Sequence, residues 1–363
     1  MIYKTVTHDN YVAIVKAIGI ILMVVGHSGC WDFLYKFIAL FHMPVFFFCS
    51  GYFFNAPSSF SDCKLFVYKR IKGLYWPYIK WSLLFLVFHN FLWRCSLYDH
   101  LTVELYTFPD ILNRVGHIMI TMTGHDQLLD GFWFLKQLLL ASVANCTILF
   151  LLKKWSWKGK YLSLILLFLL CSIVSKYFNM GIPVIWDLSI VFLSMSYFCT
   201  GCFYKKIEHI EKYSYFRIIL CFIVLLLFEF VYNDNLDMLY YSYKSLFYYF
   251  LISLCGIYMV FNIAFFLEKS LLNSILYYIG NNTMIILILH LFMFKIGNMS
   301  KILLFSLPIE RIADYKVIRE YNDFFWIVYV IIGVFFSLFI GKMIGVFYIF
   351  TKNLFKKTCE FIK

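Results

Sequence analysis

The sequence is poor in charged residues. Only 14% of its 363 residues are Asp, Glu, Lys or Arg, whereas soluble globular domains contain about 25%. Acidic residues are the scarcer kind, 20 against 32 basic residues, and the formal net charge is +12. Hydrophobic residues make up 63% of the chain and aromatic residues 22%. This composition excludes an ordinary soluble domain and predicts an integral membrane protein.

Long polar stretches are also missing, and the sequence shows no soluble domain, no low-complexity linker and no repeat. Apolar runs of about 20 residues, long enough to cross a bilayer, recur along the whole chain. We therefore expect an all-α fold: one membrane domain over residues 1–363, a polytopic helical bundle of about ten transmembrane helices. The expected spans are 12–30, 37–54, 75–94, 131–152, 161–178, 184–204, 216–232, 244–267, 276–296 and 324–350.

The excess of positively charged residues is concentrated in particular loops between the apolar runs and in the C-terminal segment. In a soluble chain it would suggest nucleic-acid binding, but membrane proteins retain Lys and Arg on the cytoplasmic side. Residues 64–72, 153–160, 205–217 and 352–363 are basic, whereas 95–130 is comparatively acidic and 297–323 is mixed. We expect both termini in the cytoplasm, a multi-pass protein of the cell inner (plasma) membrane, the bilayer as a partner and no nucleic acid. No small-residue cleavage site follows the first apolar run, which favours an uncleaved helix.

Cysteines are numerous but lack the spacing of a metal site. The eleven cysteines lie mostly within apolar runs, where a thiol packs as a small hydrophobic group. The one close pair, Cys199 and Cys202, has no second pair and no histidine within its span. We expect no metal and no permanently bound cofactor.

The first apolar run, YVAIVKAIGIILMVVGHSGC, contains two polar residues that are costly in hydrocarbon, Lys16 and His27. At 3.6 residues per turn their spacing places them about 20° apart on one face and about 16 Å apart along the axis. Gly19 and Gly26 thin the same helix and allow close approach of a neighbour. For either residue alone, a simple position at the membrane interface is an open alternative.

Three later segments place polar groups near the outer surface of the membrane, where the expected orientation also places His27. FHMPVFFFCSGYFF contains His42 and, deeper, Ser50; the short connection to the first run predicts an antiparallel pair with His42 at the depth of His27. GFWFLKQLL contributes Trp133, and ILYYIGNNTMIILILH ends at His290. Interfacial positions are an alternative for Trp133 and His290. Together the segments predict a cluster of titratable groups in the outer half of the bundle.

The motifs resemble a known family. KAIGIILMVVGH, FHMPVFFFCSGYFF, YKRIKGLYWPY, GFWFLKQLL and GNNTMIILILH are similar, in order and spacing, to those of the membrane-bound acyltransferase 3 family, over nearly the whole chain. The likeness is greatest to the fucose 4-O-acetylase-like sugar O-acetyltransferases. Many members have arginine where this chain has Lys16, which keeps the charge but not the bidentate geometry.

The resemblance implies transfer of an acyl group, commonly acetyl from acetyl-CoA, to a hydroxyl of a surface or secreted carbohydrate. An alcohol that attacks a thioester needs a base, and imidazole with an ordinary pKa near 6.5 suits neutral pH. His27 is the first candidate for that base, and His42 is the second catalytic candidate, orienting His27 or binding the acceptor.

The remaining candidates serve the two substrates. We assign Lys16, with Lys69, Arg70 and Lys72, to the acyl-CoA donor, although plain retention of positive charge on the inside also explains the last three. Trp133, His290 and Ser50 are assigned to acceptor binding or support of the site. No metal ligand is predicted.

Two other functions stay open. A transporter or flippase of a lipid-linked sugar would use an intramembrane lysine and histidine for ion coupling or phosphate binding, but needs polar groups through the full depth of the bundle. A membrane sugar polymerase would be favoured by large outer loops with arginine motifs, and residues 95–130 and 297–323 contain few arginines. The sequence identifies neither the acceptor sugar nor the oligomeric state.

Overall fold

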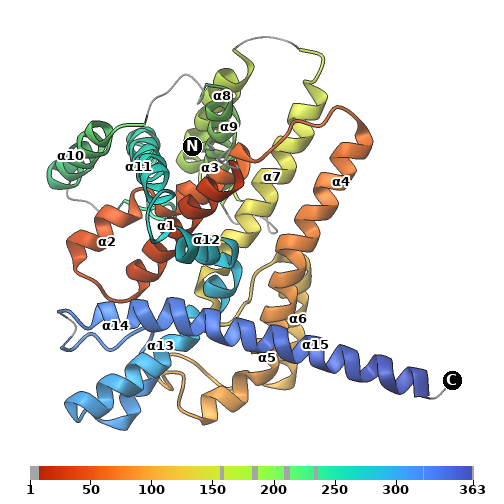
Figure 1. Ribbon diagram of the computed structural model, residues 1–363, viewed down its shortest axis with the longest axis vertical. Coiled ribbons are helices and arrows are strands. Elements are labelled where there is room, and N and C mark those ends of the chain that lie inside the picture. The colour runs from red at the N-terminus through yellow and green to blue at the C-terminus, as the bar shows by residue number, and fades with distance from the viewer. Residues whose placement is uncertain are drawn as a thin grey trace.

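A computed structural model describes residues 8–155, 159–181, 187–207, 213–232, 236–321 and 323–361, and within these ranges the chain is helical with no strand (Figure 1). Parts of the predicted basic loops, at 156–158 and 208–212, lie outside the described residues. The helices are α1 (His8–His27), α2 (Asp32–Ala39), α3 (His42–Tyr52), α4 (Phe60–Arg70), α5 (Trp76–Arg94), α6 (Phe108–Thr121), α7 (Trp133–Leu151), α8 (Lys160–Tyr177), α9 (Leu188–Ile207), α10 (Tyr215–Tyr232), α11 (Leu246–Leu267), α12 (Asn273–Asn281), α13 (Thr283–Phe305), α14 (Trp326–Ile331) and α15 (Ser337–Phe361).

Short 3₁₀ or π segments join some of these helices: η1 (Ile71–Tyr75), η2 (Gln127–Phe132), η4 (Ile309–Ala313) and η5 (Ile332–Phe336). Through η5, helices α14 and α15 form one long helix that crosses the bundle beside α13 (Figure 1).

Nine stretches of the described chain are long and apolar enough to cross a membrane. They are Asn10–His27, Asp32–Tyr52, Gln127–Leu151, Lys160–Tyr177, Leu188–Ile207, Tyr215–Tyr232, Leu246–Leu267, Thr283–Phe305 and Trp326–Phe347. The protein is therefore an all-helical, multi-pass membrane protein, as its composition predicts. The third expected span, 75–94, forms α5 but is not among the nine, because Lys80, His89 and Asn90 make this helix more polar. The orientation of the termini stays a prediction.

The second span is broken rather than continuous. α2 ends at Ala39 and α3 begins at His42, because Phe41 has a non-helical backbone, with φ of −144° and ψ of −16°. Pro44 lies in the first turn of α3, where its missing N–H leaves no hydrogen bond unmade. The break places His42 at the start of a helix that points into the bundle.

A second break divides the expected span 276–296. α12 ends at Asn281 and α13 starts at Thr283, with Asn282 between them at φ −115° and ψ 22°. α12 packs on α1 at Gly280, where an added Cβ would lie 1.8 Å from the carbonyl oxygen of Ala13. Small residues of this kind permit close helix packing in membranes.

Glycines also bring α3 against α9. A Cβ at Gly51 would lie 1.8 Å from the Phe198 carbonyl oxygen, and one at Gly201 would lie 2.0 Å from that of Phe48. On its other side α3 contacts α1, and α1 also contacts α11, α12 and α13. The two helices that carry the predicted histidine motifs are thus at the centre of the bundle.

Candidate active site

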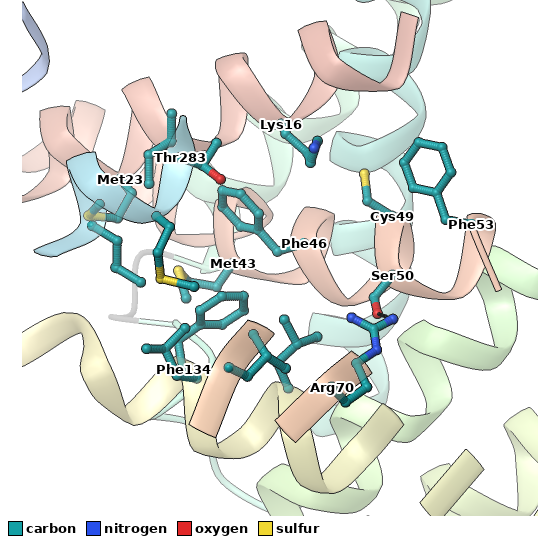
Figure 2. Close-up of a pocket in the computed structure, with 16 residues that line it drawn as sticks. Lys16, Met23, Met43, Phe46, Cys49, Ser50, Phe53, Arg70, Phe134 and Thr283 are labelled. Atoms are coloured by element: carbon teal, nitrogen blue, oxygen red, sulfur yellow. Dashed lines mark hydrogen bonds between the residues drawn. The ribbon is translucent and has the colours of Figure 1, made fainter. Parts of the chain in front are cut away.

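A cavity of about 330 Å³ lies between α1, α3, α4, α7 and α13. Its wall is mostly apolar, with Phe46, Phe134 and Leu287 among its lining residues, and its cations are Lys16 and Arg70. Figure 2 shows both basic side chains toward one end, on either side of Cys49 and Ser50, with the methionines Met23 and Met43 at the other. We call it the lysine cavity.

Arg70 is fixed at this end by two contacts. Its Nη2 donates a hydrogen bond of 2.7 Å to Ser50 Oγ, and its Cζ lies 4.9 Å from the centre of the Phe66 ring. Burial lowers the pKa of the Arg70 guanidinium to about 10, so the group stays positively charged at neutral pH. Among the described residues Arg70 forms no ion pair with a carboxylate, so its charge is available to an anionic ligand.

A second cavity, of about 160 Å³, adjoins the first. We call it the histidine cavity, because His27 and His42 both line it. Its other lining residues are Met23, Gly26, Tyr35, Met43, Asp130, Gly131, Trp133, Asp237, Met238, Leu239, Tyr240, Leu287 and Lys316. Met23, Met43 and Leu287 line both cavities, so the two spaces are neighbours and these three side chains stand between them.

One face of α1 runs along both cavities. Lys16, Ile20 and Met23 line the lysine cavity, and Met23, Gly26 and His27 line the histidine cavity. Spacings of three and four residues keep these side chains on one stripe of a helix. The structure therefore places Lys16 and His27 on the same stripe but in different cavities, as their spacing predicts.

Two histidines are held in defined tautomers. His42 Nδ1 lies 2.9 Å from the carbonyl oxygen of Ile38, and His290 Nδ1 lies 3.0 Å and 3.1 Å from those of Ile286 and Leu287. A carbonyl only accepts, so Nδ1 carries the proton in both rings and Nε2 carries the lone pair when the ring is neutral. The described residues give His290 Nε2 no hydrogen-bond partner, although it is buried.

His290 does not line the histidine cavity. Its ring lies behind His27, with the two ring centres 5.3 Å apart at an angle of 47°. Trp133, predicted to bind the acceptor, does line that cavity, whereas Ser50 lies with Arg70 in the lysine cavity. The structure thus groups Ser50 with the predicted donor residues and not with the predicted acceptor residues.

The basic motif at 69–72 divides between three environments. Arg70 lines the lysine cavity, whereas Lys69 is exposed. Lys72 lines an open groove of about 630 Å³ that also contains Trp76, Lys80 and Asn282. Met284 borders both the groove and the lysine cavity, so the groove lies next to that cavity.

The sequence did not single out three charged residues of the histidine cavity. Asp130 and Lys316 form an ion pair there, with Nζ 3.0 Å from Oδ2, and Asp237 lines the same wall. Asp130 contributes to the acidic loop and Lys316 to the mixed loop, which indicate topology alone. Neither loop carries a local signal that its charge turns inward.

In the described part of the chain, no group of three or more His, Cys, Asp or Glu side chains is placed to hold a metal ion. The cysteine pair of the sixth expected span is packed instead: Cys199 Sγ donates to Asn145 Oδ1 at 3.0 Å and Cys202 Sγ to the Gly51 carbonyl at 3.2 Å.

Comparison with known families gives one match. The family model of acyltransferase 3, described as an acyltransferase domain, matches residues 9–347. No curated protein and no solved structure matches the chain at a significant level. The matched range contains both cavities and every residue discussed at the site.

Proposed function

Because the chain belongs to the acyltransferase 3 family, we propose that this membrane acyltransferase moves an acyl group, acetyl in the simplest case, from acyl-CoA to a hydroxyl of a surface or secreted carbohydrate. The proposal rests on one observation: two adjoining cavities meet at Met23, Met43 and Leu287, with Lys16 and Arg70 lining one and His27 and His42 lining the other. Such an arrangement suits a reaction between an anionic donor and a polar acceptor that approach from opposite sides of the cell's inner membrane.

The donor occupies the lysine cavity in this proposal. Coenzyme A is anionic at its nucleotide end and carries its thioester on a long, slender arm. Lys16 and Arg70 offer positive charge at one end of the cavity, and the apolar wall suits the arm. The neighbouring groove adds Lys72, Lys80 and the aromatic faces of Trp76 and Trp81, which suit phosphates and a stacked purine.

The acyl carbon then reaches the three shared residues beside His27. The acceptor hydroxyl attacks this carbon while His27 takes its proton, and the new C–O bond forms as the C–S bond breaks. The thiolate leaves as coenzyme A and regains the proton, so the ester and the free thiol are the products. A positioned imidazole base contributes about 10²–10⁴-fold to such a step.

His42 and His290 support this step in different ways. His42 lines the cavity with its Nε2 lone pair available, because Nδ1 is bonded to Ile38, and it accepts a hydrogen bond from the acceptor sugar. His290 does not line the cavity, and its ring, 5.3 Å from that of His27 between centres, supports the orientation of the His27 ring by packing. The apolar face of a sugar ring packs on Trp133 in the same cavity. This assignment agrees with a fucose 4-O-acetylase-like activity.

The experiment is transfer by the purified protein in lipid nanodiscs, with acetyl-CoA and a panel of glycosides. Release of free thiol and the mass of the acetylated glycoside report the reaction. Wild-type protein should form an ester only when both substrates are present. A transporter of lipid-linked sugars would move its substrate and leave both molecules chemically unchanged, which would overturn the proposal. Loss of an ester from the host's surface glycans on deletion of the chain would identify the natural acceptor.

A further inference from the structure

The segment after α13 carries Lys316 into the histidine cavity and is tied to α13 by buried polar side chains. Lys295 Nζ donates to the carbonyl oxygens of Ile312, Ala313 and Asp314 at 3.2, 3.2 and 2.9 Å. Two further α13 side chains hold Ile318: Lys301 Nζ donates to its carbonyl at 2.8 Å, and Asn298 Oδ1 accepts from its amide at 3.2 Å.

These three α13 residues are spaced by three positions, lie on one face and are buried. Buried polar groups that are hydrogen-bonded in this way fix a unique arrangement of the backbone. The segment from Ile312 to Ile318 is therefore a rigid platform and not a mobile lid.

Lys316 is at the centre of a tight turn on this platform. Its φ is +59°, in the left-handed region that side chains other than glycine rarely adopt, and the Val317 amide donates to the Tyr315 carbonyl across it at 2.9 Å. Such conformations cost free energy and occur where the surrounding structure enforces them, often at functional sites. The turn directs the Lys316 side chain to Asp130, which lies within η2 and lines the cavity.

The charges of the cavity wall restrict what it can accept. Two carboxylates, Asp130 and Asp237, face one ammonium group, Lys316, so with neutral histidines the wall has a net charge of −1. Asp237 is held in place by the amides of Leu239 and Tyr240, at 2.6 Å and 2.8 Å from Oδ1. An anionic group in this cavity would meet two carboxylates in a partly desolvated space, which is unfavourable.

We propose that the Asp130–Lys316 pair recognises the acceptor, and that the acceptor unit is an uncharged, hydroxyl-rich sugar ring and not an acidic one. A sugar hydroxyl both donates and accepts, and the pair offers one partner of each kind: the carboxylate accepts and the ammonium donates. Trp133 lies in the same wall for the apolar face of the ring. This inference rests on the proposed function and adds the class of acceptor to it.

The test compares matched acceptors. A neutral methyl hexoside, the corresponding hexuronic acid and the corresponding amino sugar are each offered with acetyl-CoA to the purified protein, and kcat and KM are measured for each. Wild-type protein should use the neutral hexoside at least about tenfold better, in kcat/KM, than the uronic acid. Asp130→Asn should reduce the ratio of the two kcat/KM values by lowering the KM of the uronic acid. Lys316→Met should raise kcat/KM for the amino sugar relative to the neutral hexoside. Arg319→Met, on the same segment but exposed, is the matched control and should leave the ratio unchanged.

Exchanging the two charges distinguishes a purely structural role of the Asp130–Lys316 pair from a role in recognising the acceptor. Asp130→Lys combined with Lys316→Asp keeps the possibility of an ion pair but exchanges donor and acceptor. The double variant should regain thermal stability and not the acceptor KM. Full recovery of KM in the exchanged pair, or equal use of acidic and neutral acceptors by wild-type protein, would overturn the inference while transfer itself still stands. If no glycoside of any charge yields an ester, the proposed function fails as well.

Discussion

The imidazole rings of His27 and His290 lie 5.3 Å apart, centre to centre, at an angle of 47°. His27 is on α1 and lines the histidine cavity, whereas His290 is on α13 and fully buried. Because His290 Nδ1 is bonded to its own helix, its Nε2 lone pair is left among buried groups beside His27. His27 therefore faces the histidine cavity, whereas His290 packs beside it in the protein interior, and we expect different consequences from replacing each.

Replacement of His27 should remove the base. His27→Ala is expected to lower kcat by about 10²–10⁴-fold, because the acceptor hydroxyl then loses its proton to water or not at all. Wild-type kcat should fall at acidic pH, since a protonated imidazole cannot accept a proton. Thiol release with a saturating acceptor measures both effects.

The matched control is His117→Ala. His117 is exposed on α6 and lines neither cavity, so its replacement should leave kcat within about twofold of wild type. Transfer at the wild-type rate by correctly inserted His27→Ala protein would show that another group is the base.

Replacement of His290 should act through His27. His290→Gln keeps an acceptor atom in the buried position, whereas His290→Leu, of similar size, removes it. His290 Nε2 has no hydrogen-bond partner in the described part of the structure, so the glutamine variant tests whether this atom accepts one from protonated His27 during transfer. We expect kcat to fall about tenfold in the leucine variant and less in the glutamine variant, with the donor KM unchanged in both, because His290 lines neither cavity. Equal kcat values in the two variants, at equal thermal stability, would contradict a positioning role.

The Arg70 guanidinium should set donor affinity. Arg70→Ala is expected to raise the KM for acetyl-CoA about tenfold, since a charge-assisted contact to a phosphate or carbonyl is lost, and to change the acceptor KM little. A lysine on the same helix provides the control: Lys64, exposed on α4 and assigned to neither substrate, should leave both KM values unaltered when it is replaced in Lys64→Ala. A donor KM that rises equally in the two variants would indicate general attraction by positive charge and not a built site.

Spacing within a helix was enough to predict part of this site. Lys16 and His27 recur at helical spacing on α1, and a stripe of that kind persists in any helix, whatever packs on it. The short connection between the first two apolar runs predicts that His42 lies near His27, and both residues line the histidine cavity. The break at Phe41 was not predicted, although His42 interrupts the apolar run there and Pro44 is typical of the first turn of a helix.

The ion pair of Asp130 and Lys316 was beyond prediction from sequence. Its partners come from loops far apart in the chain, and each looks like ordinary loop charge until the platform on α13 brings them together. The same holds for Met23, Met43 and Leu287, whose apolar side chains are indistinguishable in sequence from those that face lipid. Long-range contacts decide which charges and which apolar groups line a cavity.

The three shared residues should control the length of the acyl group. Leu287→Trp would add side-chain volume where the two cavities adjoin, so we expect transfer to be lost while binding of desulfo-CoA at the lysine cavity persists. Met43→Ala removes side-chain volume at the same place and should raise the rate with butyryl-CoA relative to acetyl-CoA. Competition binding and rates across an acyl-CoA series measure these effects; an unchanged acyl preference in both variants would place the reaction elsewhere.

The crossing of α3 and α9 should tolerate no added methyl group. Gly51→Ala puts a Cβ 1.8 Å from the Phe198 carbonyl oxygen, so the helices must separate and the overpacking should cost about 1–3 kcal/mol or more. Gly116→Ala on α6, where nothing lies within 4 Å of the new Cβ, should instead stabilise by about 0.5–1 kcal/mol, because alanine favours a helix. The unfolding temperatures of the two variants are compared by heating each protein and monitoring the reactivity of its buried cysteine thiols. Equal unfolding temperatures would mean that α3 and α9 do not pack this closely, and that the wall carrying His42 is formed differently.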